Sequence, residues 1–275
     1  MTLNPTLACL MVTFSSYLPG AETYWFGNPA PTSAMRELST DRPDTTESPY
    51  TVDAGHFQIE AEPLSWTRNK QDGVTTTSMN PSVNIKVGLL TWVDLQAVVG
   101  WSRVTEEDPG NDDRVTRGVD DLTFRVKMNF WGNDGGDTAG ALMPFVTLPT
   151  HDSDFGDQRY VTGGLIAPVA FTLPSGWSAA VMLELDLERN LADDGYTTIL
   201  VQTVTASHAI IDEVDGFIEL VNNAPTESGA EATAYADAGI TWGVTPNLQF
   251  DTGTNIGLTR ASDDVRFFFG VSYRH

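Results

Sequence analysis

The sequence predicts an all-β protein, a transmembrane antiparallel up-and-down β-barrel of about 12 strands. Three observations lead to this prediction. Apolar and polar side chains alternate along many segments, each segment is about ten residues long, and turn residues separate the segments. A tilted strand needs about ten residues to cross a bilayer, and no stretch shows a sustained helical period.

The clearest alternation is "DLTFRVKMNF", residues 121–130, in which every second side chain is apolar and the others are polar or charged. In the first segment Pro63 interrupts the alternation, which predicts a shift of phase there. The eighth and ninth segments alternate poorly. The predicted strands lie at residues 55–68, 77–89, 92–104, 119–131, 139–149, 162–173, 176–189, 196–208, 216–223, 231–244, 246–257 and 264–274.

The connections between these segments alternate between short and long. Tight turns such as "GLLT" and "VTPN" contain Gly, Pro, Asn or Asp, and longer polar links such as "RNKQDGVTT", residues 68–76, lie between them. Outer-membrane barrels have short periplasmic turns and longer outer loops, and an even number of strands places both termini on the periplasmic side. A soluble β-sandwich is the alternative, but its turns would show no such alternation of length.

Residues 1–21 are predicted to be a signal peptide of atypical form. The segment "LACLMVTFSSYLPGA", residues 7–21, has the length of an apolar core and ends in small residues, but no Lys or Arg precedes it. An ordinary buried N-terminal segment is the alternative. Residues 22–52 are then expected to form a periplasmic N-terminal lead-in, and residues 53–275 the barrel.

Within the lead-in, "TDRPDTTESP", residues 40–49, has two interpretations. The prolines hold an extended path, and the acidic side chains can accept hydrogen bonds from the backbone or from Arg42. The segment is either a flexible linker or a plug or latch that folds into the barrel mouth. Its motif residues are Asp41, Arg42, Pro43, Asp44, Glu47, Ser48 and Pro49.

Charge and composition limit the classes of partner. The chain has 15 Lys and Arg against 37 Asp and Glu, a net charge of -22, which disfavours nucleic acid. The expected partners are outer-membrane lipids, the barrel-assembly machinery and a small-molecule solute. Cys9 is the only cysteine, and the four histidines lack metal-ligand or catalytic spacing, so we expect no cofactor, no metal and no enzymatic activity.

Polar side chains on the inward parity are candidates for lining a conduction path. Anions outnumber cations among them, which predicts a preference for cations if the lumen is open. The alternative is that opposite charges pair across the interior and fill it. Phe217 and Phe268 share this parity and either offer an apolar patch to an aromatic solute or pack against the lead-in. The polar candidates are Glu60, Glu62, Lys86, Asp94, Asp121, Arg125, Lys127, Glu184, Asp186, Glu188, Glu219, Asp237, Asp251 and Arg266.

Several stretches resemble the outer-membrane transporters named for the MetA pathway of phenol degradation. The most specific is "TDRPDTTESPYTVDAGHFQIE", and others are "GLLTWVDLQ", "LPTHDSDFG" and the closing "FFFGVSYR". The resemblance covers roughly residues 38–275. It implies a porin-like barrel in the outer membrane of a Gram-negative bacterium that takes up small aromatic or hydrophobic molecules passively. A non-conducting surface or adhesive protein is the alternative. The chain departs from the usual aromatic ending, because His275 follows "SYR".

Overall fold

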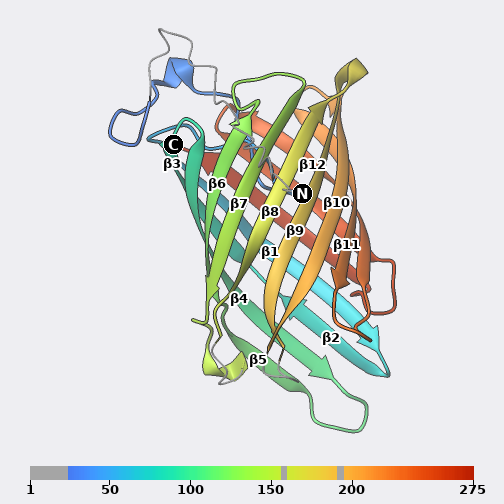
Figure 1. Cartoon of the computed structure of the whole chain (residues 1–275). Coiled ribbons are helices and arrows are strands. Elements are labelled where there is room, and N and C mark those ends of the chain that lie inside the picture. The colour runs from blue at the N-terminus through green and yellow to red at the C-terminus, as the bar shows by residue number, and fades with distance from the viewer. Residues whose placement is uncertain (1–23, 156–159, 191–194) are drawn as a thin grey trace, which may run out of the picture.

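The computed structural model describes residues 24–155, 160–190 and 195–275, and the predicted signal peptide lies outside these ranges. The described chain forms one antiparallel sheet that closes on itself, because β1 pairs with β14 (Figure 1). The strands are β1 (Phe57–Gln71), β2 (Val74–Met79), β3 (Ser82–Leu90), β4 (Val93–Glu107), β5 (Arg114–Val119), β6 (Leu122–Trp131), β7 (Thr138–Leu148), β8 (Thr162–Thr172), β9 (Trp177–Asn190), β10 (Gly195–Ile211), β11 (Val214–Pro225), β12 (Thr233–Thr245), β13 (Leu248–Gly257) and β14 (Val265–Arg274).

Two of the barrel's wall strands are each interrupted once. β2 and β3 both pair with β1 and β4, and a break at Asn80 and Pro81 separates them. β5 and β6 both pair with β4, and a break at Asp120 and Asp121 separates them. Counting each interrupted pair once, the described residues form a closed antiparallel barrel of 12 strands, which confirms the predicted fold.

The helical structure in the described ranges is limited to three short 3-10 turns. These are η1 (Thr32–Ala34), η2 (Ser153–Phe155) and η3 (Pro174–Gly176). Within the same ranges, none of the helices has the length and the apolar character needed to cross a membrane.

Most predicted strand boundaries agree with the structure to within a few residues, and the predicted phase shift is present. The register of β1 against β14 shifts between Ala61 and Leu64, on either side of Pro63. One connection was predicted wrongly. Residues 68–76 are not a long loop, because β1 and β2 continue to a two-residue turn at Asp72 and Gly73. Both turn residues have positive φ, 52° and 91°, as the tight Asp-Gly hairpin turn requires.

The two faces of the wall differ in polarity, as a membrane barrel requires. In β1, Ile59 is 45% exposed on the outer face, whereas Gln58 and Glu60 on either side of it are buried. In β9, Val181, Leu183 and Leu185 are exposed on the outer face, whereas Met182 on the inner face is 2% exposed. A band of outward apolar side chains on alternate positions is the lipid-facing surface of this class of barrel.

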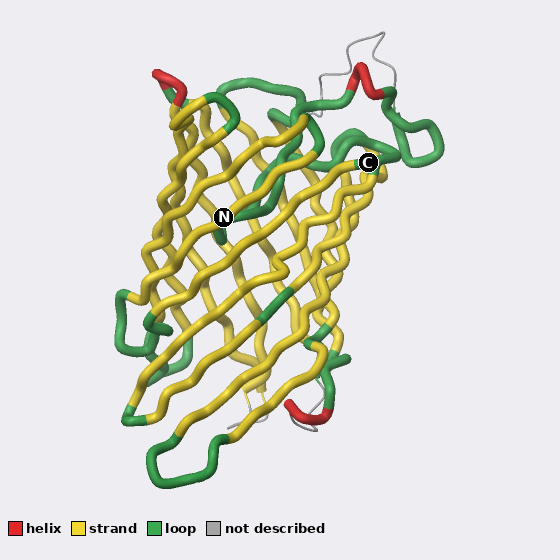
Figure 2. Tube along the Cα trace, turned by 180° about the vertical axis from the view of Figure 1, so that it is seen from behind, coloured by secondary structure: helices red, strands yellow, loops and turns green. Residues whose placement is uncertain are grey.

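Figure 2 shows the lead-in at the end of the barrel where the C-terminus lies. The lead-in is anchored there, because the Phe26 amide donates to the Leu89 carbonyl at 2.8 Å. The turns that follow β3, β6, β8, β10 and β12 lie at this end, since each of these strands runs toward it. We call it the turn end, and the opposite end the loop end.

Candidate functional site

The lead-in enters the barrel from the turn end, turns inside it, and returns to β1. The segment concerned is residues 36–56, whose polar groups bond to inward side chains of β1, β3, β4, β6, β10, β11, β13 and β14. In this structure the segment is therefore held in place by the barrel wall rather than lying free as a linker.

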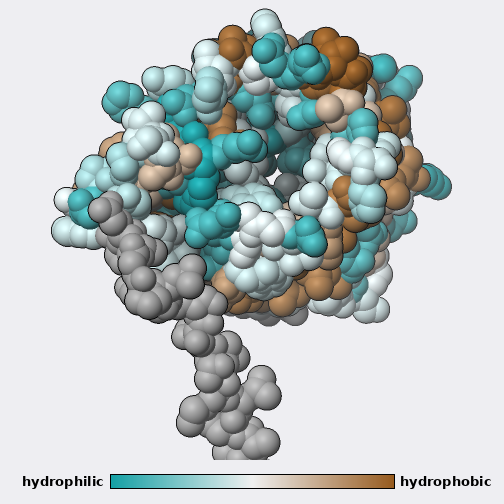
Figure 3. Space-filling view, turned by 90° about the horizontal axis from the view of Figure 1, so that it is seen from above, coloured by the Kyte–Doolittle hydropathy of each residue, from teal (hydrophilic) through white to brown (hydrophobic). Residues whose placement is uncertain are grey.

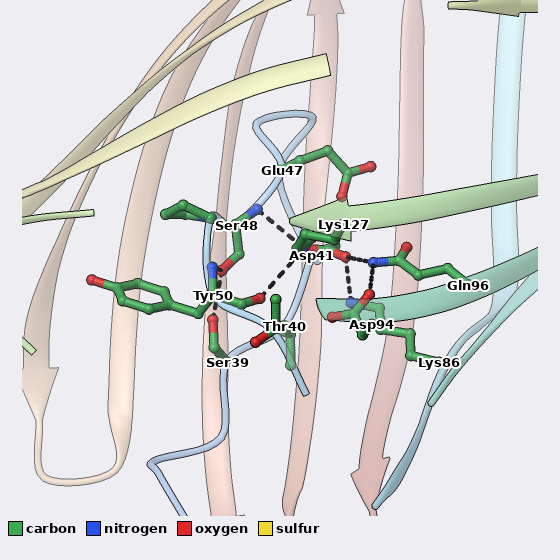
Figure 4. A network of polar contacts seen from close by, with 12 residues as sticks. Ser39, Thr40, Asp41, Glu47, Ser48, Tyr50, Lys86, Asp94, Gln96 and Lys127 are labelled. Carbon is green, nitrogen blue, oxygen red and sulfur yellow. Dashed lines mark hydrogen bonds and ion pairs between the residues drawn. The ribbon is translucent and has the colours of Figure 1, made fainter. Parts of the chain in front are cut away.

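Asp41 lies at the centre of a network of polar contacts inside the barrel (Figure 4). Its buried carboxylate forms ion pairs with Lys86 of β3 and Lys127 of β6. Gln96 donates to the same carboxylate at 3.2 Å, and the Asp41 amide donates to Glu60 at 3.1 Å. Lys86 also forms an ion pair with Glu60, whereas the ion pair of Lys127 is with Asp41. Lys127 therefore depends most on this carboxylate, because an unpaired buried charge is strongly unfavourable.

Arg42 binds the other side of the lumen. Its guanidinium donates to both carboxylate oxygens of Asp251, at 2.8 and 3.2 Å, and forms an ion pair with Glu62. It lies 5.8 Å from the centre of the Phe268 ring, so Phe268 packs against the lead-in. A Cβ at Gly270 would lie 2.3 Å from the guanidinium, and the absence of a side chain there makes room for Arg42.

The innermost part of the lead-in is bound through its backbone. The amides of Thr45 and Thr46 each donate to Glu219 of β11 at 2.8 Å. On the return path, Arg125 of β6 donates to the Glu47 carboxylate at 2.6 Å, and Asn129 donates to the Pro49 carbonyl at 2.9 Å. The Ser48 amide donates to Asp41 at 3.1 Å, which closes the turn on itself.

Further hydrogen bonds and ion pairs hold the lead-in where it leaves the lumen. The Val52 amide donates to Asp94 of β4 at 3.0 Å. Asp53 then forms ion pairs with Arg36 at 2.8 Å and with Arg274 of β14 at 3.0 Å. These contacts tie both arms of the lead-in to each other and to the last strand.

Burial raises the pKa of Asp44, and the neighbouring Glu219 carboxylate raises it further, to about 7. Asp44 lies next to Thr45, whose amide binds that same Glu219. The tip of the lead-in therefore combines backbone hydrogen bonds with carboxylates that repel one another when ionised.

A different surface lines the lumen at β7 to β10. Its buried side chains form one apolar cluster, Met143, Ile166, Met182 and Val201, with Phe145 and Ile199 packed against it. We call these six residues the apolar patch. The lead-in contacts it where the Glu47 amide lies 3.3 Å from the Met182 sulfur. Sequence reasoning missed the patch because, apart from Phe217 and Phe268, only polar side chains of the inward parity were collected, although Ile166 and Met182 also lie on that parity.

Carboxylates extend from the apolar patch toward the loop end. Glu184, Asp186 and Glu188 follow Met182 at alternate positions of β9. One oxygen of Asp186 is buried without a hydrogen-bond partner among the described residues. Asp237 of β12 is 4% exposed and lies directly opposite Glu219 of β11 and Asn255 of β13.

The predicted lining residues thus fall into distinct groups. Those that are buried are Glu60, Glu62, Lys86, Asp94, Lys127, Glu219, Asp237 and Asp251. Arg125, Glu184, Asp186 and Arg266 are half-buried, and Glu188 is exposed. Asp121 lies in the break between β5 and β6 and binds His151 at 2.6 Å, away from the lead-in contacts. Phe217 is buried on β11.

A cavity of about 540 Å³ opens at the turn end between the lead-in and the wall. Leu38 and Tyr50 of the lead-in line one side, and Gly135, Gly136 and Thr172 line the other. Figure 3 looks onto this end and shows mainly hydrophilic residues around a hollow near its centre. Since Thr172 ends β8, which also carries Ile166, the cavity adjoins the strands of the apolar patch.

Comparison with known proteins agrees with this geometry. A family model described as "Putative MetA-pathway of phenol degradation" matches residues 40–275. No curated protein matches the sequence. An outer-membrane channel from Pseudomonas putida F1 is 13% identical, with a TM-score of 0.60 over 86% of this chain and 100% of that chain.

Two autotransporter domains share the same barrel architecture. The translocator domain of NalP from Neisseria meningitidis is 12% identical, with a TM-score of 0.50 over 80% of this chain and 88% of that chain. The β domain of the Bordetella autotransporter Brka is 14% identical, with a TM-score of 0.50 over 79% of this chain and 98% of that chain. At these identities the likenesses concern the fold.

Proposed function

The chain belongs to the family of the MetA pathway of phenol degradation, and on that premise we propose that it is an outer-membrane channel for passive uptake of small aromatic or hydrophobic molecules. The observation that carries this proposal is the apolar patch on the inner face of β7 to β10. Met143, Ile166 and Met182 are at most 2% exposed, and the lead-in touches Met182. The cluster would give an aromatic ring a place to bind once the lead-in moves aside.

The path runs between the lead-in and the inner face of β7 to β9. Strand direction orders its parts, since β9 runs from the turn end to the loop end. A solute entering from the loop end meets Glu188, Asp186 and Glu184, then Met182 and the rest of the patch. It leaves through the cavity beside Thr172. No bond is made or broken on this path, so the role is transport rather than catalysis.

The proposed orientation places the turn end in the periplasm and the loop end outside the cell. Assembly by the barrel-assembly machinery would then use β14, although the chain ends in His275. Tyr273 supplies an outward aromatic side chain two residues earlier, and the His275 amide donates to the Phe57 carbonyl at 2.8 Å, which helps to close the barrel.

Two measurements, made one after the other, test the proposed function. Electrophoresis of outer-membrane fractions with and without boiling should show a heat-dependent shift, because a closed barrel resists unfolding in detergent. Proteoliposomes should then admit phenyl glucoside, a neutral aromatic solute that crosses lipid slowly, faster than protein-free liposomes do. A heat-stable barrel that admits no phenyl glucoside would instead indicate a non-conducting surface protein.

A further inference from the structure

Charges inside the lumen are neutralised on one side only. The lysines and arginines that contact the lead-in are matched by carboxylates of the lead-in or the wall, as in the pairs of Asp41, Glu62 and Asp53. Among the described side chains, no ion pair joins Glu184, Asp186 or Glu188 to a lysine or arginine. Arg125 lies close enough to act on Glu184 and Asp186 electrostatically, but its hydrogen bond goes to Glu47.

On β9 these carboxylates have few hydrogen-bond donors. Glu184 and Asp186 interact with each other, and one buried oxygen of Asp186 has no hydrogen-bond partner among the described residues. Removing an ionised carboxylate from water without a donor is costly, and a cationic group that approaches it relieves that cost. These side chains are therefore placed to attract a positive group and to repel a negative one.

Charge and apolar surface lie within the span of one small molecule. Glu184 and Met182 are two positions apart on the same face of β9, which places their Cα atoms about 6.5 Å apart. Methionine sulfur also makes favourable contacts with aromatic rings. An aromatic ring on the apolar patch would thus leave an attached ammonium group beside Glu184 and Asp186.

We propose that this path selects by charge, so that aromatic solutes carrying a quaternary or primary ammonium group pass best, neutral ones next, and aromatic anions least. The selectivity rests on the proposed channel function and assigns its preferred solute class. Glu184 and Asp186 are the residues that determine it, and Met182 and Ile166 hold the ring.

The test uses three solutes of similar aromatic character that cross lipid slowly. These are benzyltrimethylammonium, phenyl glucoside and benzenesulfonate, measured as fluxes into proteoliposomes containing the whole protein. We expect the cation to enter roughly tenfold faster than the anion, a ratio that about 1.4 kcal/mol of electrostatic preference produces.

The variant Glu184→Gln with Asp186→Asn should reduce that ratio by at least about threefold. A matched variant, Glu106→Gln with Glu107→Gln at the far end of β4, removes two charges outside the path and should leave the ratio unchanged.

The outcomes distinguish failure of the proposed channel function from failure of the proposed charge selectivity. If phenyl glucoside does not enter, the channel function fails and the selectivity fails with it. If phenyl glucoside enters while cation and anion fluxes are equal, the channel stands and the selectivity is wrong. If the Glu184 and Asp186 variant keeps its heat-dependent gel shift and its cation-to-anion ratio, these residues do not determine selectivity. Glu184→Gln alone gives a second test should the double variant fail to assemble.

Discussion

The two sides of the lumen satisfy their charges in different ways. The lead-in wall, formed by inward side chains of β1, β3, β4, β6, β13 and β14, binds residues 36–56 through buried ion pairs. The free wall, formed by inward side chains of β7, β8 and β9 with Val201 and Ile199 of β10, carries the apolar patch and the carboxylates Glu184, Asp186 and Glu188.

This difference is the basis of our proposal that one barrel holds a bound segment and still passes solutes. Buried ion pairs contribute little net stability, but breaking one is costly, so they fix the position of a segment well. On the lead-in wall they hold a segment that occupies part of the lumen. On the free wall Glu184, Asp186 and Glu188 form no ion pair with a lysine or arginine among the described residues, and this is the side on which we propose that solutes pass.

Removal of residues 38–50 should produce the largest change, because it removes the inserted segment itself. We expect single-channel conductance in planar bilayers to rise several-fold. Deletion of residues 108–113, the connection between β4 and β5 at the loop end, is the control and should change conductance far less. Unchanged currents after deletion of 38–50 would mean that the lead-in does not obstruct the path.

Asp41→Asn should be the most damaging single substitution among the contacts between the lead-in and the lead-in wall. It leaves Lys86 and Lys127 buried with one carboxylate fewer, at an expected cost of about 3–5 kcal/mol. Because the lead-in can leave its place while the barrel stays closed, we expect faster protease cleavage of residues 36–56 in detergent. Asp108→Asn in the exposed loop is the control. Cleavage as slow as in the unmodified protein would contradict this account.

Conductance should depend on pH through Asp44. Its pKa lies near 7 in the bound lead-in and near 3.8 in a solvated chain, so the bound form holds its proton more tightly. Binding of the lead-in therefore weakens as the pH rises from about 4 to about 7, and this group adds no further change above that range. The groups facing Asp44 are Glu219 and Thr205 of the wall and Glu47 of the lead-in.

We expect the time spent in the high-conductance state to rise several-fold from pH 5 to pH 8. Asp44→Asn should flatten that dependence. A variant whose conductance varies with pH as strongly as that of the unmodified protein would show that another group is responsible.

The smallest effect concerns Arg125, which lies at the edge of the lead-in wall on β6, the strand that pairs with β7 of the free wall. Arg125→Gln removes a half-buried positive charge, and the permeability ratio of potassium to chloride should rise about twofold. Reversal potentials in a salt gradient measure this ratio, with Arg114→Gln at the loop end as the control. Lys127 is unsuited to this measurement, because it is 1% exposed and bound to Asp41.

The alternation of apolar and polar side chains, together with the turn residues, was sufficient to predict the barrel. In a closed sheet in lipid, each strand residue faces either the lipid or the lumen, so its polarity is constrained. The error at residues 68–76 arose because Arg68 to Gln71 are all polar, so alternation is invisible where a strand extends beyond the apolar band. The Asp72 and Gly73 pair was the signal that could have corrected it.

The site was less predictable, because its contacts join segments that are distant in the chain. The motif around Asp41 and Arg42 stood out, but their partners Lys127 and Asp251 are 86 and 209 residues away. The alternation along each strand identified which polar side chains face the lumen, but it did not show which of them form ion pairs with one another. The apolar patch needed the register of four strands, since no single strand carries more than two of its members.

The central claim is that solutes pass along the free wall and not along the lead-in wall. Single cysteines in a Cys9→Ser background test it directly, by block of current with a methanethiosulfonate reagent. Met182→Cys lies on the free wall and Ser272→Cys on the lead-in wall, and both are fully buried inward positions when the lead-in is bound. We predict that reagent blocks Met182→Cys channels and leaves Ser272→Cys channels conducting. Block at Ser272→Cys with none at Met182→Cys would contradict the account.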